Sequence, residues 1–195
     1  GSSAAGEFQK FTAARQHDGE VVKVLVKFSG SDASPSSERW ADLLVCEHWA
    51  TRILPRCMGV AAAETRILQT AGRTFLESVR FDRHGAHGRS PVSTWAAINS
   101  TWFGMTGESW TQGAARLRER RLIQQAVAED IARLSHFGRL IANTDMHDGN
   151  LSFRPTRING RPEFELAPAY DMLPMLYAPV RCVELPQGNF QPHLP

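Results

Sequence analysis

The chain has 195 residues, of which 22 are basic and 20 are acidic, so its formal net charge is only +2. A balance this small, with no concentrated basic run, argues against direct binding of nucleic acid or of a charged membrane surface. The hydrophobic share of 42% predicts a globular protein with a buried core. No apolar run approaches the roughly 18 residues of a membrane span. Three cysteines without zinc-like spacing fit reduced thiols in a cytoplasmic protein.

The first half of the chain predicts a small sheet with one helix. We expect a strand ending at about residue 15, a hairpin turn at Asp18-Gly19 and a second strand over residues 21–28. The second strand alternates, with one face formed by Val22, Val24, Val26 and Phe28. Lys27 is therefore expected to point away from the core, either as a solvent-facing lysine or as the phosphate-contacting lysine of a kinase strand.

A helix is predicted over residues 38–54 from apolar residues at helical spacing, with Pro55 near its end. Glu47 falls on the buried stripe of this helix. A buried carboxylate needs a partner. Two interpretations stay open: Glu47 reaches water at the edge of the stripe, or it holds the strand lysine in place over a nucleotide.

A second hairpin is expected from residues 64–69 and 73–81, joined at Ala71-Gly72. The Gly/His segment that follows, residues 83–89, contains two histidines three apart. Without a nearby third ligand, it is interpreted as a mobile loop and not as a metal site.

The second half of the chain predicts helices around a polar loop. We expect a short helix starting at Ser90-Pro91, and one or two packed helices over residues 114–142 that deliver the chain to Asn143. A hairpin formed by residues 151–153 and 163–166 then brings Asp171 back toward the loop.

The polar loop has the spacing of a phosphoryl-transfer site. Asp145 and Asn150 are five residues apart, as in the kinase catalytic loop, where the aspartate takes the hydroxyl proton and the asparagine holds a metal ion. Asn150 and Asp171 supply hard oxygen ligands that suit Mg²⁺. His147 is expected to contact phosphate or support the loop.

Several segments together resemble one known family. Residues 145–153, Asp-Met-His-Asp-Gly-Asn-Leu-Ser-Phe, and residues 166–171, Leu-Ala-Pro-Ala-Tyr-Asp, resemble the signature of the HipA-type Ser/Thr kinases, the toxins of bacterial toxin–antitoxin modules. Residues 3–10 are similar to the family's phosphate loop, residues 26–27 to its lysine strand, and residues 79–83 to the hinge that borders adenine.

The resemblance implies an ATP- and Mg²⁺-dependent protein kinase with an α+β, two-lobed fold that we expect to be truncated at both ends. The small, mixed, β-rich N-lobe would be residues 1–90 and the mainly helical C-lobe residues 91–195. Asp145 would be the catalytic base, Asn150 and Asp171 the metal ligands, and Glu47 a supporting residue. The implied ATP-binding residues are Ala5, Gly6, Glu7, Phe8, Gln9, Lys10, Lys27, Val79, Arg80, Phe81, His147, Asp148, Gly149, Asn150, Tyr170 and Asp171.

The family also implies regulation and partners. Its members phosphorylate a serine of their own phosphate loop, a position that falls on Ser3, with Ser2 as its neighbour. Known family substrates are aminoacyl-tRNA synthetases, and an antitoxin is the expected protein partner. Two alternatives remain. One is an inactive kinase-like binding module that acts with a DNA-binding antitoxin. The other is a metal-dependent nuclease that uses Asp145, His147, Asn150 and Asp171.

Overall fold

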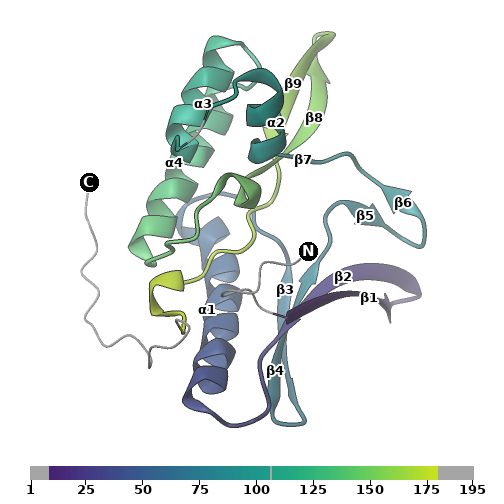
Figure 1. Ribbon diagram of the computed structural model, residues 1–195. Helices are drawn as coiled ribbons and strands as arrows, with labels where there is room; N and C mark the ends of the chain where they lie inside the picture. Colours follow the sequence, from purple (N-terminus) through teal and green to yellow (C-terminus); the bar gives the residue numbers. More distant parts are fainter. Residues whose placement is uncertain (1–8, 106, 180–195) are drawn as a thin grey trace.

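The computed structural model describes residues 9–105 and 107–179. Its first part is a four-stranded antiparallel sheet with the strand order β1-β2-β4-β3. The strands are β1 (Gln9–His17), β2 (Glu20–Phe28), β3 (Thr65–Thr70) and β4 (Arg73–Val79). Helix α1 (Pro35–Cys57) lies between this sheet and the helical remainder of the chain (Figure 1).

Both predicted hairpins of the sheet are confirmed. Asp18 and Gly19 have φ values of 51° and 83°, and Ala71 and Gly72 have 50° and 69°. Two successive positive φ values belong to the tight turn whose twist matches that of antiparallel strands. These turns set the registers that place Lys10 opposite Lys27 and Ile67 opposite Leu76.

Helix α1 is longer at both ends than the predicted 38–54. Ser34 caps its start, with Oγ accepting a hydrogen bond from the Ser37 amide at 3.2 Å, and Pro35 occupies the first turn, where a missing amide costs nothing. Pro55 lies inside the last turn, and the helix ends at Cys57. Its buried side includes Leu43, Leu44, Glu47, Ala50, Thr51 and Leu54.

The remainder of the chain is mainly helical, with α2 (Trp95–Trp102), α3 (Trp110–Glu119) and α4 (Gln125–Leu140). The predicted helix start at Ser90-Pro91 is wrong. Ser93–Thr94 forms a short strand, β7, that pairs with β8 (Ser152–Ile158), and Thr94 caps α2 by accepting from the Ala97 amide. The side chain of a capping residue needs an extended backbone, which Thr94 has at the end of β7.

Two hairpins and two 3₁₀ turns complete the described chain. The hairpin predicted from residues 151–153 and 163–166 is confirmed, with longer strands β8 (Ser152–Ile158) and β9 (Arg161–Leu166) that turn at Asn159-Gly160. The expected loop at residues 83–89 instead forms a two-stranded hairpin, β5 (Arg83–His84) with β6 (Gly88–Arg89). Single 3₁₀ turns occur at Asp148–Asn150 and Met175–Tyr177.

The hydrophobic core joins the two parts of the molecule. Its main cluster contains Ala50 and Leu54 from α1 together with buried residues of the helical part, among them Trp95, Leu117, Ile131, Leu134 and Phe153. A second cluster packs Leu43 of α1 against Leu173 and Ala178. Helix α1 also packs against β3 and β4 of the sheet, so Glu47 is positioned between the sheet and the C-terminal segments. No helix within residues 9–105 and 107–179 combines the length and the apolar character needed to cross a bilayer.

Candidate active site

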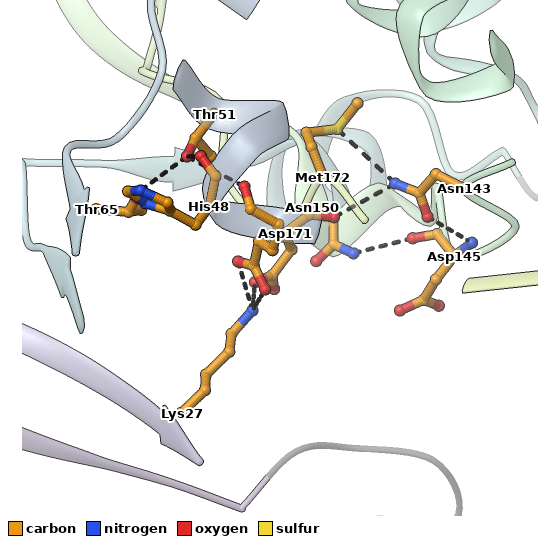
Figure 2. Close-up of polar contacts among 10 residues, drawn as sticks. Lys27, His48, Thr51, Thr65, Asn143, Asp145, Asn150, Asp171 and Met172 are labelled. Atoms are coloured by element: carbon orange, nitrogen blue, oxygen red, sulfur yellow. Dashed lines mark hydrogen bonds and ion pairs between the residues drawn. The ribbon is translucent and has the colours of Figure 1, made fainter. Parts of the chain in front are cut away.

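Lys27, Glu47 and Asp171 form one buried ionic cluster. Lys27 Nζ donates to both carboxylate oxygens of Glu47 at 2.8 Å. It also donates to Asp171 Oδ1 (Figure 2). Lys27 is 6% exposed and Glu47 is 2% exposed. These side chains come from β2, from α1 and from the segment after β9, so the fold brings together three distant parts of the chain.

The expectation that Lys27 points away from the core is wrong. Its neighbour across the strands, Leu76, is fully buried, because α1 packs on the side of the sheet that carries both residues. Cross-strand partners share a face. Of the two interpretations of Glu47, the one in which the carboxylate meets the strand lysine agrees with the structure.

One cation between two carboxylates shifts the pKa of all three groups. Burial alone would lower the pKa of Lys27, but the charges of Glu47 and Asp171 outweigh it and raise that pKa above its ordinary value. Burial raises the pKa of Glu47 to about 7, against the opposing effect of Lys27. Burial also acts to raise the pKa of Asp171, but Lys27 outweighs it and lowers that pKa. Asp171 is thus the carboxylate that keeps its negative charge, and Glu47 is the one that takes up a proton near neutral pH.

The loop after α4 is held by side-chain amides. Asn143 Oδ1 accepts from the Asp145 amide at 3.0 Å, and Asn143 Nδ2 donates to the backbone oxygen of Asp171 at 3.3 Å (Figure 2). Asn150 Nδ2 donates to the backbone oxygen of Asp145 at 2.9 Å. Because these bonds use backbone atoms of Asp145, its carboxylate is left about half exposed and accessible to another molecule.

Asp171 has an unusual backbone conformation. Its φ is 54°, in the left-handed region, where a residue with a Cβ is strained by roughly 1 kcal/mol or more. The hydrogen bond from Asn143 to its carbonyl and the ion pair from Lys27 to its carboxylate hold it there. Such strain persists where several contacts fix one geometry, which is common at functional sites.

Further contacts tie down residues 147–149. Trp110 Nε1 donates to the backbone oxygen of His147 at 3.3 Å, and Asn99 Nδ2 donates to Asp148 Oδ2 at 3.2 Å. Tyr170 donates its hydroxyl proton to the backbone oxygen of Gly149 at 2.8 Å, and its oxygen lies 2.6 Å from Ser152 Oγ. His147 Nδ1 accepts from the Gly149 amide, and its Nε2 lies 4.0 Å from Asp145 Oδ1. The loop is therefore anchored to α2, α3 and the segment before Asp171.

The expected hinge, residues 79–81, lies against β2 and the β8–β9 hairpin. The amides of Val79 and Arg80 donate to Glu64 O and Lys23 O. The backbone oxygen of Phe81 accepts from Arg154 Nη2 at 3.3 Å, and its ring lies 6.1 Å from that of Tyr170. Among the described residues, the Phe81 amide donates no backbone hydrogen bond.

The predicted phosphate-loop residues lie partly in β1 and partly outside the described residues. Gln9 and Lys10 lie in β1, where Lys10 pairs with Lys27. Ser2, Ser3, Ala5, Gly6, Glu7 and Phe8 lie outside the described residues. The structure brings Lys27, Glu47, Asn143, Asp145, Asn150 and Asp171 into one network, and their functional roles remain predictions.

Three of the residues that anchor the loop, Asn99, Trp110 and Asn143, were not predicted to have a role. Asn99 and Trp110 lie on helices remote in sequence, and no spacing marks them. Asn143 carries a local signal, because an asparagine side chain often accepts from the amide two residues later.

The oxygen atoms available in this network fit a small divalent cation. The Asn150 bond to Asp145 uses the amide nitrogen, so the amide oxygen is not consumed by it. Together with the Asp171 carboxylate, this oxygen gives two hard ligands, the number and kind that Mg²⁺ takes from proteins while keeping several waters.

Comparisons with known proteins identify relatives for most of the chain. Residues 2–189 match the model of the HipA-like C-terminal domain family. The chain is 44% identical over 180 residues to Toxin YjjJ of Escherichia coli strain K12, covering 92% of this chain and 39% of that protein. It thus spans about two fifths of the length of this curated relative.

Solved structures agree on the fold. The HipA, HipB and operator DNA complex of the Shewanella oneidensis MR-1 toxin–antitoxin system contains a chain that superposes with a TM-score of 0.59 at 19% identity, over 88% of this chain and 43% of that one. The Helicobacter pylori proinflammatory kinase CtkA superposes with a TM-score of 0.56 at 16% identity, over 88% of this chain and 54% of that one. The predicted α+β, kinase-like fold is confirmed.

Proposed function

Because the chain belongs to the HipA-like C-terminal domain family of HipA-type toxins, we propose that it is the phosphotransferase part of an ATP- and Mg²⁺-dependent Ser/Thr protein kinase. The observation that carries this proposal is the Lys27 ammonium bound to Glu47 of α1 and to Asp171 after β9. Protein kinases need a strand lysine paired with a helix glutamate, together with a metal-binding aspartate. In this proposal, residues 1–90 form the N-lobe and residues 91–195 the C-lobe.

Asp145 is the proposed base. Its half-exposed carboxylate takes the proton of a serine or threonine hydroxyl while that oxygen attacks the γ-phosphorus and the bond to the β,γ-bridging oxygen breaks, which releases ADP. Asn143 and Asn150 fix the backbone of Asp145, so the carboxylate is positioned before substrate arrives.

Lys27 and the hinge are the proposed nucleotide contacts. The Phe81 amide donates to adenine, and the Lys27 ammonium neutralises phosphate oxygens, supported by residues 5–10. Mg²⁺, when bound by Asn150 and Asp171, supplies counter-charge to the transferred phosphoryl group. Tyr170 acts mainly through the loop, because its hydroxyl is already bonded to Gly149 and Ser152.

The activity of the whole protein and its partners belong to the proposal as well. A HipA chain occurs with HipB and operator DNA in the Shewanella complex, which supports an antitoxin partner for the protein to which this chain corresponds. We place autophosphorylation on Ser3 or its neighbour Ser2. The proposed protein substrate is a component of translation such as an aminoacyl-tRNA synthetase.

Mass spectrometry after incubation with ATP and Mg²⁺ tests the proposal. We expect phosphate on Ser2 or Ser3 in the wild type and in Asp42→Asn, a matched change of an exposed carboxylate on α1. In Asp145→Asn we expect transfer to fall by about 100-fold or more, as removal of a catalytic base does. If the wild type binds Mg·ATP but transfers no phosphate, the result would support the alternative of an inactive kinase-like binding module. Mg²⁺-dependent cleavage of RNA or DNA without ATP would identify a nuclease.

A further inference from the structure

A basic groove lies beside the middle of β2, next to the ionic cluster at Lys27. Its volume is about 420 Å³, and its walls are the β1–β2 and β5–β6 hairpins, which lie side by side (Figure 1). Lys23, four residues before Lys27 on the same face of the strand, projects from β2. At 3.3 Å per residue, the two lysines are about 13 Å apart.

The charge of this groove is strongly one-sided. Its described lining includes Lys23, Arg80, Arg83 and Arg89 but no carboxylate. Asp82, just outside, bonds to both Arg80 and Arg83, so one negative charge is shared by two guanidinium groups. Four cations against one carboxylate leave an excess of three positive charges in a chain whose formal net charge is only +2. Like charges gathered in a concave site repel one another, and an anion relieves that repulsion.

The shape and chemistry of the walls favour a peptide over other anions. The lining between the cations consists of Thr12, Ala13, Ala14, Ala86, His87 and Gly88, so the backbone of both hairpins is accessible. The groove has no Phe, Tyr or Trp among its described lining residues, and single-stranded nucleic acid is normally bound by stacking on such rings. An extended peptide fits, because β1 is an edge strand and acidic side chains can pair with Lys23 and Arg89.

We propose that the groove between the β1–β2 and β5–β6 hairpins binds an acidic segment of a protein partner. Lys23 provides the charge of the β1–β2 wall, Arg83 and Arg89 provide those of the β5–β6 wall, and Arg80 adds a fourth cation to the lining. This inference goes beyond the proposed function and does not depend on phosphoryl transfer. The docking site contains neither Lys27 nor Asp171. It borders the proposed hinge through the Arg80 side chain, whereas the hinge contact proposed for adenine is the backbone amide of Phe81.

Fluorescence anisotropy with a fluorescein-labelled octa-aspartate peptide tests the site in 50 mM salt. The double variant Lys23→Glu/Arg89→Glu should bind the peptide at least tenfold more weakly than the wild type. The control Arg157→Glu/Arg161→Glu makes the same charge change on two exposed residues of the β8–β9 hairpin and should leave the dissociation constant within twofold. Excess Mg·ATP should not displace the peptide.

Other outcomes would overturn the proposal. Equal weakening in the two double variants would mean that the peptide responds to overall charge only. Displacement by stoichiometric ATP would assign the groove to the nucleotide. Tighter binding of a labelled oligo(dT) octamer than of octa-aspartate, lost in the same groove variant, would make it a nucleic-acid site. A midpoint of thermal unfolding equal to that of the wild type would show that Lys23→Glu/Arg89→Glu is folded.

Discussion

Replacing Lys27 by methionine tests how much the ionic cluster of Lys27, Glu47 and Asp171 contributes to the free energy of unfolding. The change keeps the length of the side chain but removes the charge that Glu47 and Asp171 share. Breaking a buried ion pair from one side costs about 3–5 kcal/mol, because a charge is left without a partner. The Asp171 side chain is 29% exposed and recovers part of this from water, so we expect about 3 kcal/mol at pH 8.

The same variant should show a distinct pH dependence. Glu47 has a folded-state pKa of about 7 against an ordinary value of 4.5, so its contribution to stability is fully present below 4.5 and is lost as the pH rises to about 7. Without Lys27, Glu47 stays protonated to still higher pH. Between pH 7 and 9, the free energy of unfolding of Lys27→Met should therefore fall relative to the wild type by up to about 1.4 kcal/mol per pH unit.

Urea unfolding followed by circular dichroism at pH 6, 7, 8 and 9 measures both effects. Lys23→Met is the matched control: it makes the same chemical change on the same strand and face, and Lys23 has no ion pair among the described residues. An equal loss of stability in Lys23→Met and Lys27→Met would refute the reasoning. So would a difference between Lys27→Met and wild type that stays constant across the pH series.

Three further changes probe how the site is supported. Asn143→Asp keeps the acceptor for the Asp145 amide but replaces the donor to the Asp171 carbonyl with an oxygen. In a kinase assay, we expect the Mg²⁺ concentration for half-maximal rate to rise several-fold. An unchanged Mg²⁺ titration would contradict the role of Asn143 in positioning Asp171. Gly113→Ala would place a Cβ 2.6 Å from the Trp95 ring, so calorimetry should show a loss of about 1–3 kcal/mol where an exposed helix would gain. Tyr170→Phe loses both hydroxyl hydrogen bonds, and a destabilisation of about 1–2 kcal/mol in urea is expected; a fully stable variant would show that the hydroxyl does not hold the loop.

Much of the fold could be predicted because its signals are local. Asp18-Gly19 and Ala71-Gly72 mark turns through their own backbone preferences, and the helical spacing from residue 114 onward marks α3 and α4. The direction of Lys27 could not be predicted in this way. Alternation along β2 separates two faces, but which face receives a helix depends on how α1 folds back onto the sheet.

The site, too, combines features that the local sequence predicts with contacts that depend on the fold. The five-residue spacing of Asp145 and Asn150 is visible in the sequence, and the structure connects them by a hydrogen bond. The contacts of Asn143 with Asp171 and of Asn99 with Asp148 join residues 28 and 49 positions apart. Such pairings arise from packing between α2, α4 and the C-terminal segment, and one sequence contains no periodic pattern that reports them.

The contact between Lys27 and Asp171 sets a competition at the proposed metal site. Lys27 holds Oδ1 of Asp171, so a divalent cation that took this oxygen as a ligand would compete with the ammonium, and the observed metal affinity would be a difference between two binding free energies. Weakening the lysine contact would then tighten metal binding while it removes the charge that faces the phosphates. Under this arrangement, the variant with the highest affinity for Mg²⁺ is not the one with the fastest transfer.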